Sequence, residues 1–556
     1  MAISLIIPIA GAFLVFIASP YGPGLTNDST RYLRIANVLR GDHELGKGYP
    51  EFMRHFPPGY PALLAAGKFI NLSNQTTGRW LNVVAMALTA FIVTRTVQRL
   101  CNVELWPGLV AAAIVVTSHV SLMMHLHVWS EPTFQVFLLV TLALLVRQVE
   151  APTPRHAILI ALVVAASTMI RYAGASLIIM GAITLLFVQR TSWKNRLIDC
   201  VIFCLIAATP LLSLAAYNRH RAGGGEAIDR QLAHYGLHQV QFREAWTTMA
   251  TWIFPEHKVP PKRRNWAFLV VVVSFCAVVA SRMSIRKRAR ETGEYIRPPL
   301  PAYVRLALLM CVVYLGFLFV SLAFVDPATP LDDRILSPIY LLAIIVGMYG
   351  VHRALTLTGA MTAPMAGKIA TVVMLIAFVV STAIRGYDIW QFSKREGFGY
   401  VNVRWRESEL MKVIKAIPPN TLVYTNVPDA VYFYTTNQSR LIPKSNQKLS
   451  AKQMKEMKYN LKNTQHRIRK EGAVIALFYG TADTRFRRGT QSPAEIEKVL
   501  NARRVLKAKD GVLLIPVNAT PKVKKIVARA RRHVFPKPET TFPATASTTK
   551  PSRASS

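Results

Sequence analysis

Residues 303–325 read YVRLALLMCVVYLGFLFVSLAFV, an apolar run whose one charged residue is Arg305. A helix rises about 1.5 Å per residue, so about 20 such residues cross the hydrocarbon core of a bilayer. Similar apolar segments occur at residues 3–19, 80–97, 107–124, 132–146, 157–170, 174–188, 199–216, 266–281, 335–350 and 369–385. The sequence therefore predicts a polytopic α-helical membrane protein with about 11 transmembrane helices.

The composition agrees with a membrane protein. The chain has 556 residues, of which 52% are hydrophobic, and its mean hydropathy is +0.28. Its formal net charge of +38 is compatible with nucleic acid, an anionic membrane surface or anionic lipid substrates as partners. No nucleic-acid-binding motif accompanies the basic residues, so nucleic acid is not a predicted partner. The five cysteines lie in or beside apolar segments, and we predict neither disulfides nor a metal site.

The orientation follows from the basic loops, because Lys and Arg in short loops stay on the cytoplasmic side. Residues 281–290, SRMSIRKRAR, form the most basic short loop and should be cytoplasmic. Counting alternately from there places the N-terminus inside and the C-terminus outside. The predicted outer stretches are residues 20–79, 125–131, 217–265, 326–334 and those after about 386. We therefore expect a multi-pass protein of the inner (plasma) membrane.

The predicted domains differ in composition. Residues 1–385 form a transmembrane module with a first outer loop, 20–79, and a second large outer loop, 217–265. Residues 386–535 alternate helix-like stretches at 406–417, 451–471 and 493–501 with apolar, strand-like stretches at 421–425 and 473–479, and a likely hairpin runs through Asp510-Gly511 to Pro516. This alternation predicts a C-terminal extracytoplasmic α/β domain. The Pro-, Thr- and Ser-rich residues 536–556 should be disordered. A little over half of the net charge lies beyond residue 386, which indicates either attraction to anionic headgroups or glycans, or simply a solvated basic surface.

Two acidic residues lie at the predicted outer face. Asp28 follows the first span directly, where a carboxylate can act as a base, although an acid there can also cap the next helix. Glu131 lies at a span boundary, where a charge is costly unless it is paired or solvated, and it can equally be a helix-start residue before Pro132. His125 and His127 nearby are interpreted as packing residues, since no third metal ligand accompanies them.

Arginines also occur at the outer ends of several spans. They are Arg171, Arg219, Arg221 and Arg334. Guanidinium groups at headgroup depth suit a lipid-linked phosphate, which they can bind bidentately. Interfacial snorkelling is the alternative for any one of them. Several arginines at one level, beside two acids, favour a functional site.

The order of these motifs resembles the GT-C glycosyltransferases, polytopic membrane enzymes that include protein mannosyltransferases, aminoarabinose transferase and lipopolysaccharide-core transferases. The resemblance rests on Asp28-Ser29 with Tyr32, Pro57–Pro61 around Tyr60, Trp129–Pro132, Arg171–Gly174, Asn218-Arg219, and Asp333-Arg334 through Tyr340. It covers the membrane region to about residue 350. Residues 397–400 and 405–406 look like the soluble tail of bacterial members.

The resemblance implies an inverting transfer of a hexosyl or pentosyl group from a polyprenyl-phosphate sugar to a glycan, lipid or protein acceptor outside the cytoplasm. Asp28 would take the acceptor proton, and Glu131 would orient the acceptor or Asp28. The donor lipid phosphate would be bound by Arg171, Arg219, Arg221, Arg334 and Tyr340, while Tyr32 and Tyr60 would position the acceptor or the loop.

One residue departs from the resemblance. Many members carry two adjacent acids in the first loop, and here Asn27 precedes Asp28. We therefore expect a metal-independent enzyme without a cofactor other than its donor. A lipid-linked sugar flippase or transporter and a non-catalytic envelope scaffold are the alternatives. The few charges within the spans speak against a transporter, and a scaffold leaves the ordered acids and arginines unexplained.

Overall fold

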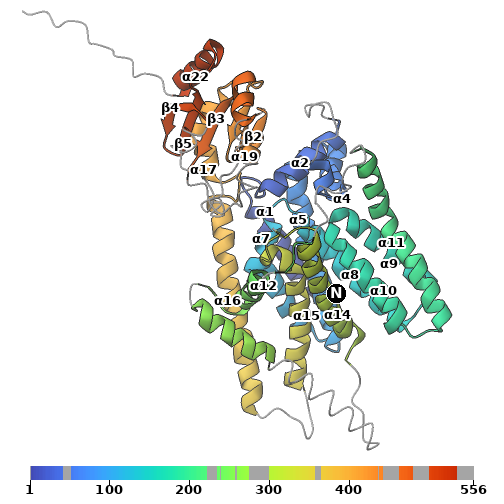
Figure 1. Ribbon diagram of the computed structural model, residues 1–556. Coiled ribbons are helices and arrows are strands. Elements are labelled where there is room, and N and C mark those ends of the chain that lie inside the picture. Colours follow the sequence, from blue (N-terminus) through green and yellow to red (C-terminus); the bar gives the residue numbers. More distant parts are fainter. Residues whose placement is uncertain are drawn as a thin grey trace, which may run out of the picture. The chain divides into compact units, whose positions relative to one another are not determined.

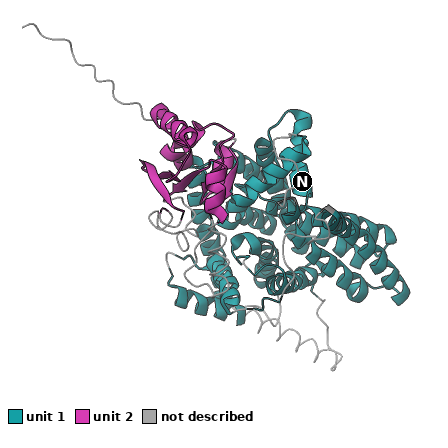
Figure 2. Ribbon diagram, turned by 45° about the horizontal axis from the view of Figure 1, so that its top comes forward, with its two compact units in different colours: residues 1–402 teal, residues 403–556 magenta. Residues whose placement is uncertain are grey.

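The computed structural model describes residues 2–41, 52–221, 234–237, 239–256, 259–273, 300–327, 329–356, 365–435, 437–442, 463–479, 497 and 500–534. The chain divides into two compact units, Met1–Asn402 and Val403–Ser556 (Figure 2). The first unit is helical, and the second holds a β-sheet (Figure 1). The sequence prediction places the boundary at residue 386, but α16 (Met365–Arg395) continues as a helix beyond that point.

The first unit is built from apolar helices joined by short polar segments. They are α1 (Ile3–Ile17), α2 (Asn27–Leu39), α3 (Phe52–His55), α4 (Gly59–Ala66), α5 (Asn74–Leu100), α6 (Leu105–Thr117), α7 (His119–His125), α8 (Glu131–Glu150), α9 (Pro154–Ile170), α10 (Ala175–Ile183), α11 (Trp193–Arg221), α12 (Gln239–Ile253), α14 (Ala302–Phe324), α15 (Asp333–Thr356) and α16, with single turns η1 (Gly67–Ile70), η2 (Tyr172–Gly174) and η3 (Thr184–Val188). The side chains of Ser73, Ser118 and Thr153 cap the N-termini of α5, α7 and α9 by accepting a backbone N–H.

Six of the described helices, α5, α8, α11, α14, α15 and α16, have the length and hydropathy of membrane spans. The predicted span 107–124 is two helices, α6 and α7, which meet at an angle of 59° and together pass the same test. Shorter apolar helices occupy Ile3–Ile17, Pro154–Ile170 and Tyr172–Val188. The predicted span 266–281 lies partly outside the described residues. The described helices thus supply six spans, or seven with the bent pair, and the predicted number of eleven stays a prediction.

Helix α5 lies at the centre of the packing and contacts α1, α6 and α8. Helix α16 packs against α6 and α7. Gly386 permits this approach, because a Cβ atom at this position would lie 1.6 Å from the carbonyl oxygen of Thr117. Any larger residue there would push α16 away from the bend between α6 and α7.

The chain between α1 and α2 folds back onto the bundle through short pairings. Gly24 forms a bridge with His127, and Leu25 forms one with Gly399. Gly399 has a φ of +56°, and a Cβ atom there would lie 1.9 Å from the carbonyl oxygen of Leu25. A residue without a side chain is therefore required at this close approach. The pairing fixes the chain directly before α2, which carries Asp28.

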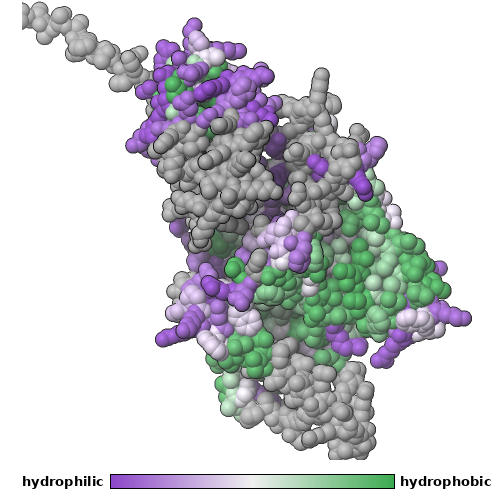
Figure 3. Space-filling view, in the orientation of Figure 1, coloured by the Kyte–Doolittle hydropathy of each residue, from purple (hydrophilic) through white to green (hydrophobic). Residues whose placement is uncertain are grey.

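The outer surface of the helical unit is strongly apolar. Figure 3 shows hydrophobic residues over a broad area of the face that includes α9, α10 and α11. Exposed side chains there include Leu162, Phe187 and Leu205, each more than half exposed. Such an area is far larger than soluble proteins expose, and it fits contact with lipid chains.

The second unit contains a mixed five-stranded sheet with the order β2-β1-β3-β5-β4. Its strands are β1 (Val423–Thr425), β2 (Ser439–Leu441), β3 (Val474–Phe478), β4 (Ala502–Ala508) and β5 (Gly511–Pro516). Strand β1 pairs in parallel with β2 and β3, whereas β5 is antiparallel to β3 and β4. The helices are α17 (Val403–Glu407), α18 (Glu409–Lys415), α19 (Pro428–Tyr434) and α22 (Pro521–Val534). The central strands β3 and β5 are buried throughout, as their apolar sequences require.

Most of the C-terminal sequence signals fall on these elements. The apolar stretches 421–425 and 473–479 contain β1 and β3, and the predicted hairpin through Asp510-Gly511 is β4 and β5. The amphipathic stretch 406–417 contains α18. Most of the predicted helices 451–471 and 493–501, and the predicted disordered tail, lie outside the described residues.

Candidate functional site

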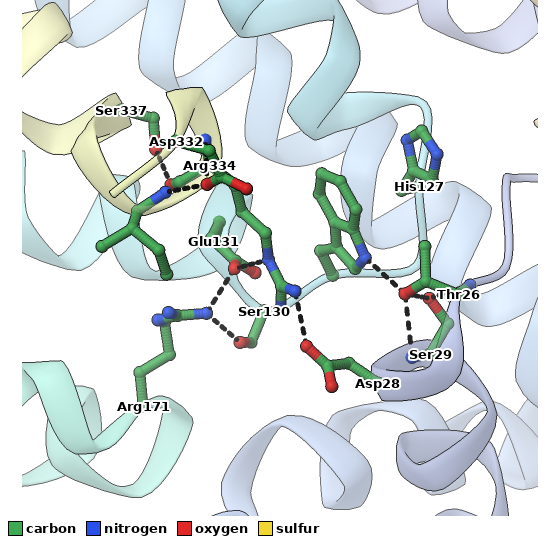
Figure 4. Close-up of polar contacts among 12 residues, drawn as sticks. Thr26, Asp28, Ser29, His127, Ser130, Glu131, Arg171, Asp332, Arg334 and Ser337 are labelled. Carbon is green, nitrogen blue, oxygen red and sulfur yellow. Dashed lines mark hydrogen bonds and ion pairs between the residues drawn. The ribbon is translucent and has the colours of Figure 1, made fainter. Parts of the chain in front are cut away.

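Asp28 lies in the first turn of α2, but it does not cap that helix. The cap is Thr26, whose side chain accepts from the backbone N–H of Ser29, while the Ser29 hydroxyl accepts from the N–H of Thr26. The Asp28 carboxylate is therefore available for another partner. Its Oδ2 atom is 2.5 Å from Nη1 of Arg334, at the N-terminal end of α15 (Figure 4).

Glu131 begins α8 and its side chain is only 3% exposed. Its Oε1 atom accepts hydrogen bonds from Nε of Arg334 and from Nη1 of Arg171, the latter at 2.6 Å (Figure 4). Arg171 also donates to the hydroxyl of Ser130 at 3.1 Å. The second carboxylate oxygen, Oε2, is buried and has no hydrogen-bond partner among the described residues. A buried acceptor without a partner is costly in a finished structure, so this oxygen is a candidate contact for a ligand.

Arg334 joins the two acids. Its Nη1 faces Asp28 and its Nε faces Glu131, so one guanidinium bridges carboxylates that are more than one hundred residues apart in the sequence. The same guanidinium lies 4.6 Å from the ring centre of Trp129, close enough for a cation–π interaction. The indole of Trp129 in turn donates to the hydroxyl of Thr26 at 2.9 Å. The four charged groups of this network, two carboxylates and two guanidiniums, sum to zero.

The start of α15 is held by its own cap. Oδ1 of Asp332 accepts the backbone N–H groups of Arg334 and Ile335, at 3.1 and 3.2 Å (Figure 4). This satisfies donors that the first helical turn would otherwise leave unpaired. The cap therefore fixes the direction in which the Arg334 side chain leaves the helix.

The protonation state of Asp28 follows from its surroundings. Burial raises the pKa of its carboxyl, but the adjacent Arg334 guanidinium lowers it by more, so the pKa lies below its ordinary value of 3.8. Asp28 is therefore a carboxylate at neutral pH. Burial also lowers the pKa of His127 to about 4, so this imidazole is neutral where it stacks on Trp129.

Two tyrosines line the same region. The Tyr32 hydroxyl lies 3.1 Å from the Ser130 hydroxyl, and its ring meets that of Tyr60 edge to face at 5.1 Å. Burial, and then the nearby Glu131, raise the pKa of Tyr32 to about 12. The Tyr60 hydroxyl is fully buried and has no hydrogen-bond partner among the described residues. Both phenols stay protonated and can donate to a bound oxygen.

The remaining predicted residues lie elsewhere or outside the description. Arg219 is exposed near the C-terminal end of α11 and makes none of the described contacts of the Arg334 network. Arg221 ends α11, but its side chain lies outside the described residues. Tyr340 is buried on α15 and packs edge to face against Trp252. The structure thus brings together Asp28, Glu131, Arg171, Arg334, Tyr32 and Tyr60, and it adds Trp129, Ser130 and Thr26.

In the sequence, Trp129 and Ser130 are visible only as part of the motif around Glu131, and Thr26 only as a neighbour of Asp28. Ser130 belongs to the site through its contact with Arg171, Trp129 through its contact with Arg334, and Thr26 through its bond to Trp129. Such contacts depend on which helices pack together. Within the described residues, no group of three or more His, Cys, Asp or Glu side chains lies close enough to hold a metal ion.

Comparisons with known proteins give one matching family and several similar structures. Residues 55–213 match the family described as dolichyl-phosphate-mannose-protein mannosyltransferase. The arabinofuranosyltransferase AftD from Mycobacteria is similar in structure, with a TM-score of 0.53 and 12% identity over 93% of this chain and 40% of that one. ArnT from Cupriavidus metallidurans bound to undecaprenyl phosphate gives a TM-score of 0.49 and 12% identity over 92% of this chain and 98% of that one. No curated protein sequence matches the chain significantly.

Proposed function

We propose that the chain is a GT-C membrane glycosyltransferase, which transfers a sugar from a polyprenyl-phosphate-linked donor to an acceptor outside the cytoplasm. The match of residues 55–213 to a mannosyltransferase family and the similarity of the fold to AftD support this. The observation that carries the proposal is the buried network in which Arg334 bridges Asp28 and Glu131. The matching family is described by a dolichyl-phosphate sugar, which is a lipid-linked donor of this kind. The sugar, hexosyl or pentosyl, is left to experiment.

The reaction that suits this network is a direct displacement with inversion. The acceptor oxygen attacks the anomeric carbon from the side opposite the phosphate, and its proton passes to the Asp28 carboxylate. The bond between the anomeric carbon and the phosphate oxygen breaks, and the lipid phosphate leaves with both electrons. Arg334 and Arg171 stabilise the negative charge that develops on that phosphate.

Arg334 then has two competing partners. In the structure Arg334 lowers the pKa of the Asp28 carboxyl, which makes this carboxylate a weak base. A donor phosphate that attracts Arg334 weakens this pair, and the pKa of Asp28 rises toward the pH at which it accepts a proton efficiently. Binding of the donor thus activates the base, and without a donor Asp28 stays unreactive.

In this reaction Glu131 positions Arg171 and Arg334 and does not accept the proton of the acceptor hydroxyl. Its Oε1 atom accepts from both guanidiniums, which keeps two like charges close together. Its Oε2 atom, which lacks a partner among the described residues, would accept a hydroxyl of the acceptor sugar or of the donor. Tyr60, whose hydroxyl also lacks a partner among the described residues, is placed to donate to the same ligand.

We expect the reaction to need no divalent cation. A metal ion would serve to neutralise the two acids and to bind the phosphate. Arg334 bonds to both acids in this arrangement, and in the proposed reaction it would bind the phosphate. Asn27 supports this, because its Oδ1 accepts from the hydroxyl of Tyr400 and it adds no second carboxylate beside Asp28. The basic loop 281–290 supports an inner-membrane protein with this site and Val403–Ser556 on the outer side.

The proposal is tested by sugar transfer in membranes that contain the full chain. Asp28→Asn should lower transfer from polyprenyl-linked donors by about 10²- to 10⁴-fold, the contribution of a general base. Asp326→Asn is the matched control, because Asp326 precedes α15 and contacts Thr329, outside the network. Full activity of Asp28→Asn, with the protein folded, would refute the assignment.

A further inference from the structure

A pocket lined largely by polar and charged residues lies beside the start of α15, outside the network of Asp28 and Glu131. Its volume is about 400 Å³, within the range of about 300–1,000 Å³ typical of small-molecule sites. Most of its lining residues lie on or next to four helices, α7, α12, α15 and α16, of which α15 contacts the other three. The lining residues are His119, Thr247, Thr248, Thr251, Glu256, Asp332, Asp333, Arg385, Asp388 and Ile389.

Specific hydrogen bonds hold the walls in place. The hydroxyl of Thr248 donates to the carbonyl of Leu331 at 2.8 Å, and the indole of Trp252 donates to Asp333 at 2.9 Å. Arg385 donates to the last carbonyls of α12, those of Thr251 at 2.6 Å and of Trp252 at 2.9 Å. These bonds tie α12 to α15 and α16. The pocket therefore has a defined shape before any ligand binds.

The chemistry of the lining excludes one class of ligand. Four carboxylates, those of Glu256, Asp332, Asp333 and Asp388, line the pocket with one guanidinium, that of Arg385, and a second guanidinium, that of Arg264, lies 3.6 Å from Glu256. The Arg385 guanidinium already donates to two backbone carbonyls, so few of its N–H groups remain for an anion. A phosphate would meet a negative potential here, and the lipid phosphate of the donor must bind elsewhere.

The same lining favours a ligand with several hydroxyl groups. Carboxylates are strong acceptors for O–H donors. The hydroxyls of Thr248 and Thr251 already donate to backbone carbonyls, so they offer a ligand acceptor sites, and the hydroxyl of Thr247 also lines the pocket. Among the described residues no three acids or histidines are close enough to share a metal ion, so these acceptors are spread around the cavity. Spread acceptors fit an extended ligand with donors at several positions. A carbohydrate has this pattern.

The pocket is connected to the network by consecutive residues. Asp332 and Asp333 line the pocket, while the next residue, Arg334, bonds to Asp28 and Glu131. Asp332 itself caps the turn from which the Arg334 side chain extends (Figure 4). A ligand in the pocket therefore lies beside the turn that fixes the proposed phosphate-binding arginine.

We propose that this pocket binds a neutral or amine-bearing carbohydrate unit of the acceptor, next to the position at which its hydroxyl is deprotonated. That this carbohydrate is the acceptor rests on the proposed function. That the pocket binds a carbohydrate is tested by binding alone. Recognition comes from the carboxylates of Glu256, Asp332, Asp333 and Asp388 and from the threonine hydroxyls of α12. A sugar that carries a carboxylate is rejected by the same acids.

The test uses three hexoses that share a ring and differ in charge: glucosamine, glucose and glucuronate. Binding to the full chain in neutral-lipid nanodiscs is measured by saturation-transfer NMR, which detects weak ligands. We expect glucosamine and glucose to receive saturation and glucuronate to receive none. The variant Glu256→Gln/Asp388→Asn should weaken the binding of glucose about tenfold, because two charged acceptors become neutral ones.

Two controls make the outcome decisive. Glu150→Gln removes an exposed carboxylate at the far end of α8 and should leave sugar binding unchanged. The binding assay contains no donor and measures no transfer, so a failure of the transfer assay and a failure of this proposal are distinguishable. Glu256 and Asp388 are exposed, and a thermal unfolding curve verifies that the double variant is folded. Equal binding by wild type and the double variant, equal binding of glucuronate and glucose, or no binding of any hexose would overturn the proposal.

Discussion

Replacement of Glu131 by glutamine should destabilise the protein by about 3 kcal/mol. The side chain keeps its shape and one acceptor oxygen, but the bonds to Arg171 and Arg334 become bonds to a neutral group. Each such change costs roughly 1 kcal/mol, the difference between hydrogen bonds to charged and to neutral partners. The network then holds two guanidiniums and one carboxylate, and the excess buried positive charge adds to the cost, which for a broken buried pair reaches about 3–5 kcal/mol.

A double-mutant cycle separates the ionic contribution from general damage. Arg171→Met removes the excess positive charge, so Glu131→Gln/Arg171→Met should be less destabilised than the sum of the single variants by about 2 kcal/mol. The assay is reversible unfolding of the full chain in mixed micelles, followed by tryptophan fluorescence. Glu150→Gln, at the exposed end of the same helix, should change stability by less than about 0.5 kcal/mol. Strictly additive single variants would refute the reasoning that Glu131 stabilises the pair of arginines.

Three further predictions follow from the same structure. Asp28 has a lowered pKa, so its ion pair stabilises the fold at pH values above about 4, and this stabilisation is lost as the pH falls through the folded pKa. Arg334→Gln removes the strongest influence that lowers this pKa and leaves burial opposed only by the weaker effects of Arg31 and His55. The acidic limb of the transfer rate should then move to higher pH, and an unmoved limb would exclude Asp28 as the titrating base. Transfer should be unchanged by EDTA, and a loss that Mg²⁺ or Mn²⁺ restores would contradict the metal-independent mechanism. Gly399→Ala should lower the melting temperature, at a cost of about 1–3 kcal/mol, because of its positive φ and its contact with the Leu25 carbonyl, whereas Gly316→Ala, which meets no atom within 4 Å, should not lower it.

The sequence predicts which residues matter better than it predicts how they meet. Asp28, Glu131, Arg171 and Arg334 each lie beside an apolar segment, which places them at the same depth by helical geometry alone. Their pairing depends on the packing of α8, α9 and α15 and on the return of the first outer loop through Gly24 and Leu25, and no periodicity in the sequence contains this information. The sequence predicts that these arginines bind the donor phosphate. In the described structure, which contains no ligand, Arg171 and Arg334 form ion pairs with Asp28 and Glu131.

The helix boundaries show a similar limit. The stretch 107–124 has continuous hydropathy and predicts one span, yet the chain bends by 59° between α6 and α7 at Ser118, whose side chain caps α7. A single serine in an apolar run carries almost no weight in a hydropathy average. Helix α8 extends past the predicted end at residue 146 to Glu150, because Gln148 is buried and its amide donates to Gln189 and Asp199. Buried polar partners therefore decide positions that apolar patterns leave open.

The pocket beside α15 was not predicted from the sequence for the same reason. Its carboxylates come from three separate segments, and only Asp332 and Asp333 are adjacent in the chain. The threonines that face them lie on α12, in a stretch that the sequence assigns to an outer loop. The contacts of Thr248, Arg385 and Trp252 help to bring these segments to one cavity.

The measurement that tests the account most directly is the structure of the full chain in lipid nanodiscs with undecaprenyl phosphate bound. The central claim is that the network of Asp28, Glu131, Arg171 and Arg334 is where the phosphate of the donor leaves. We predict that the phosphate contacts the Arg334 guanidinium, and that the separation of Arg334 from Asp28 grows beyond its present 2.5 Å. A phosphate bound away from both arginines, with the pair of Arg334 and Asp28 intact, would contradict the claim.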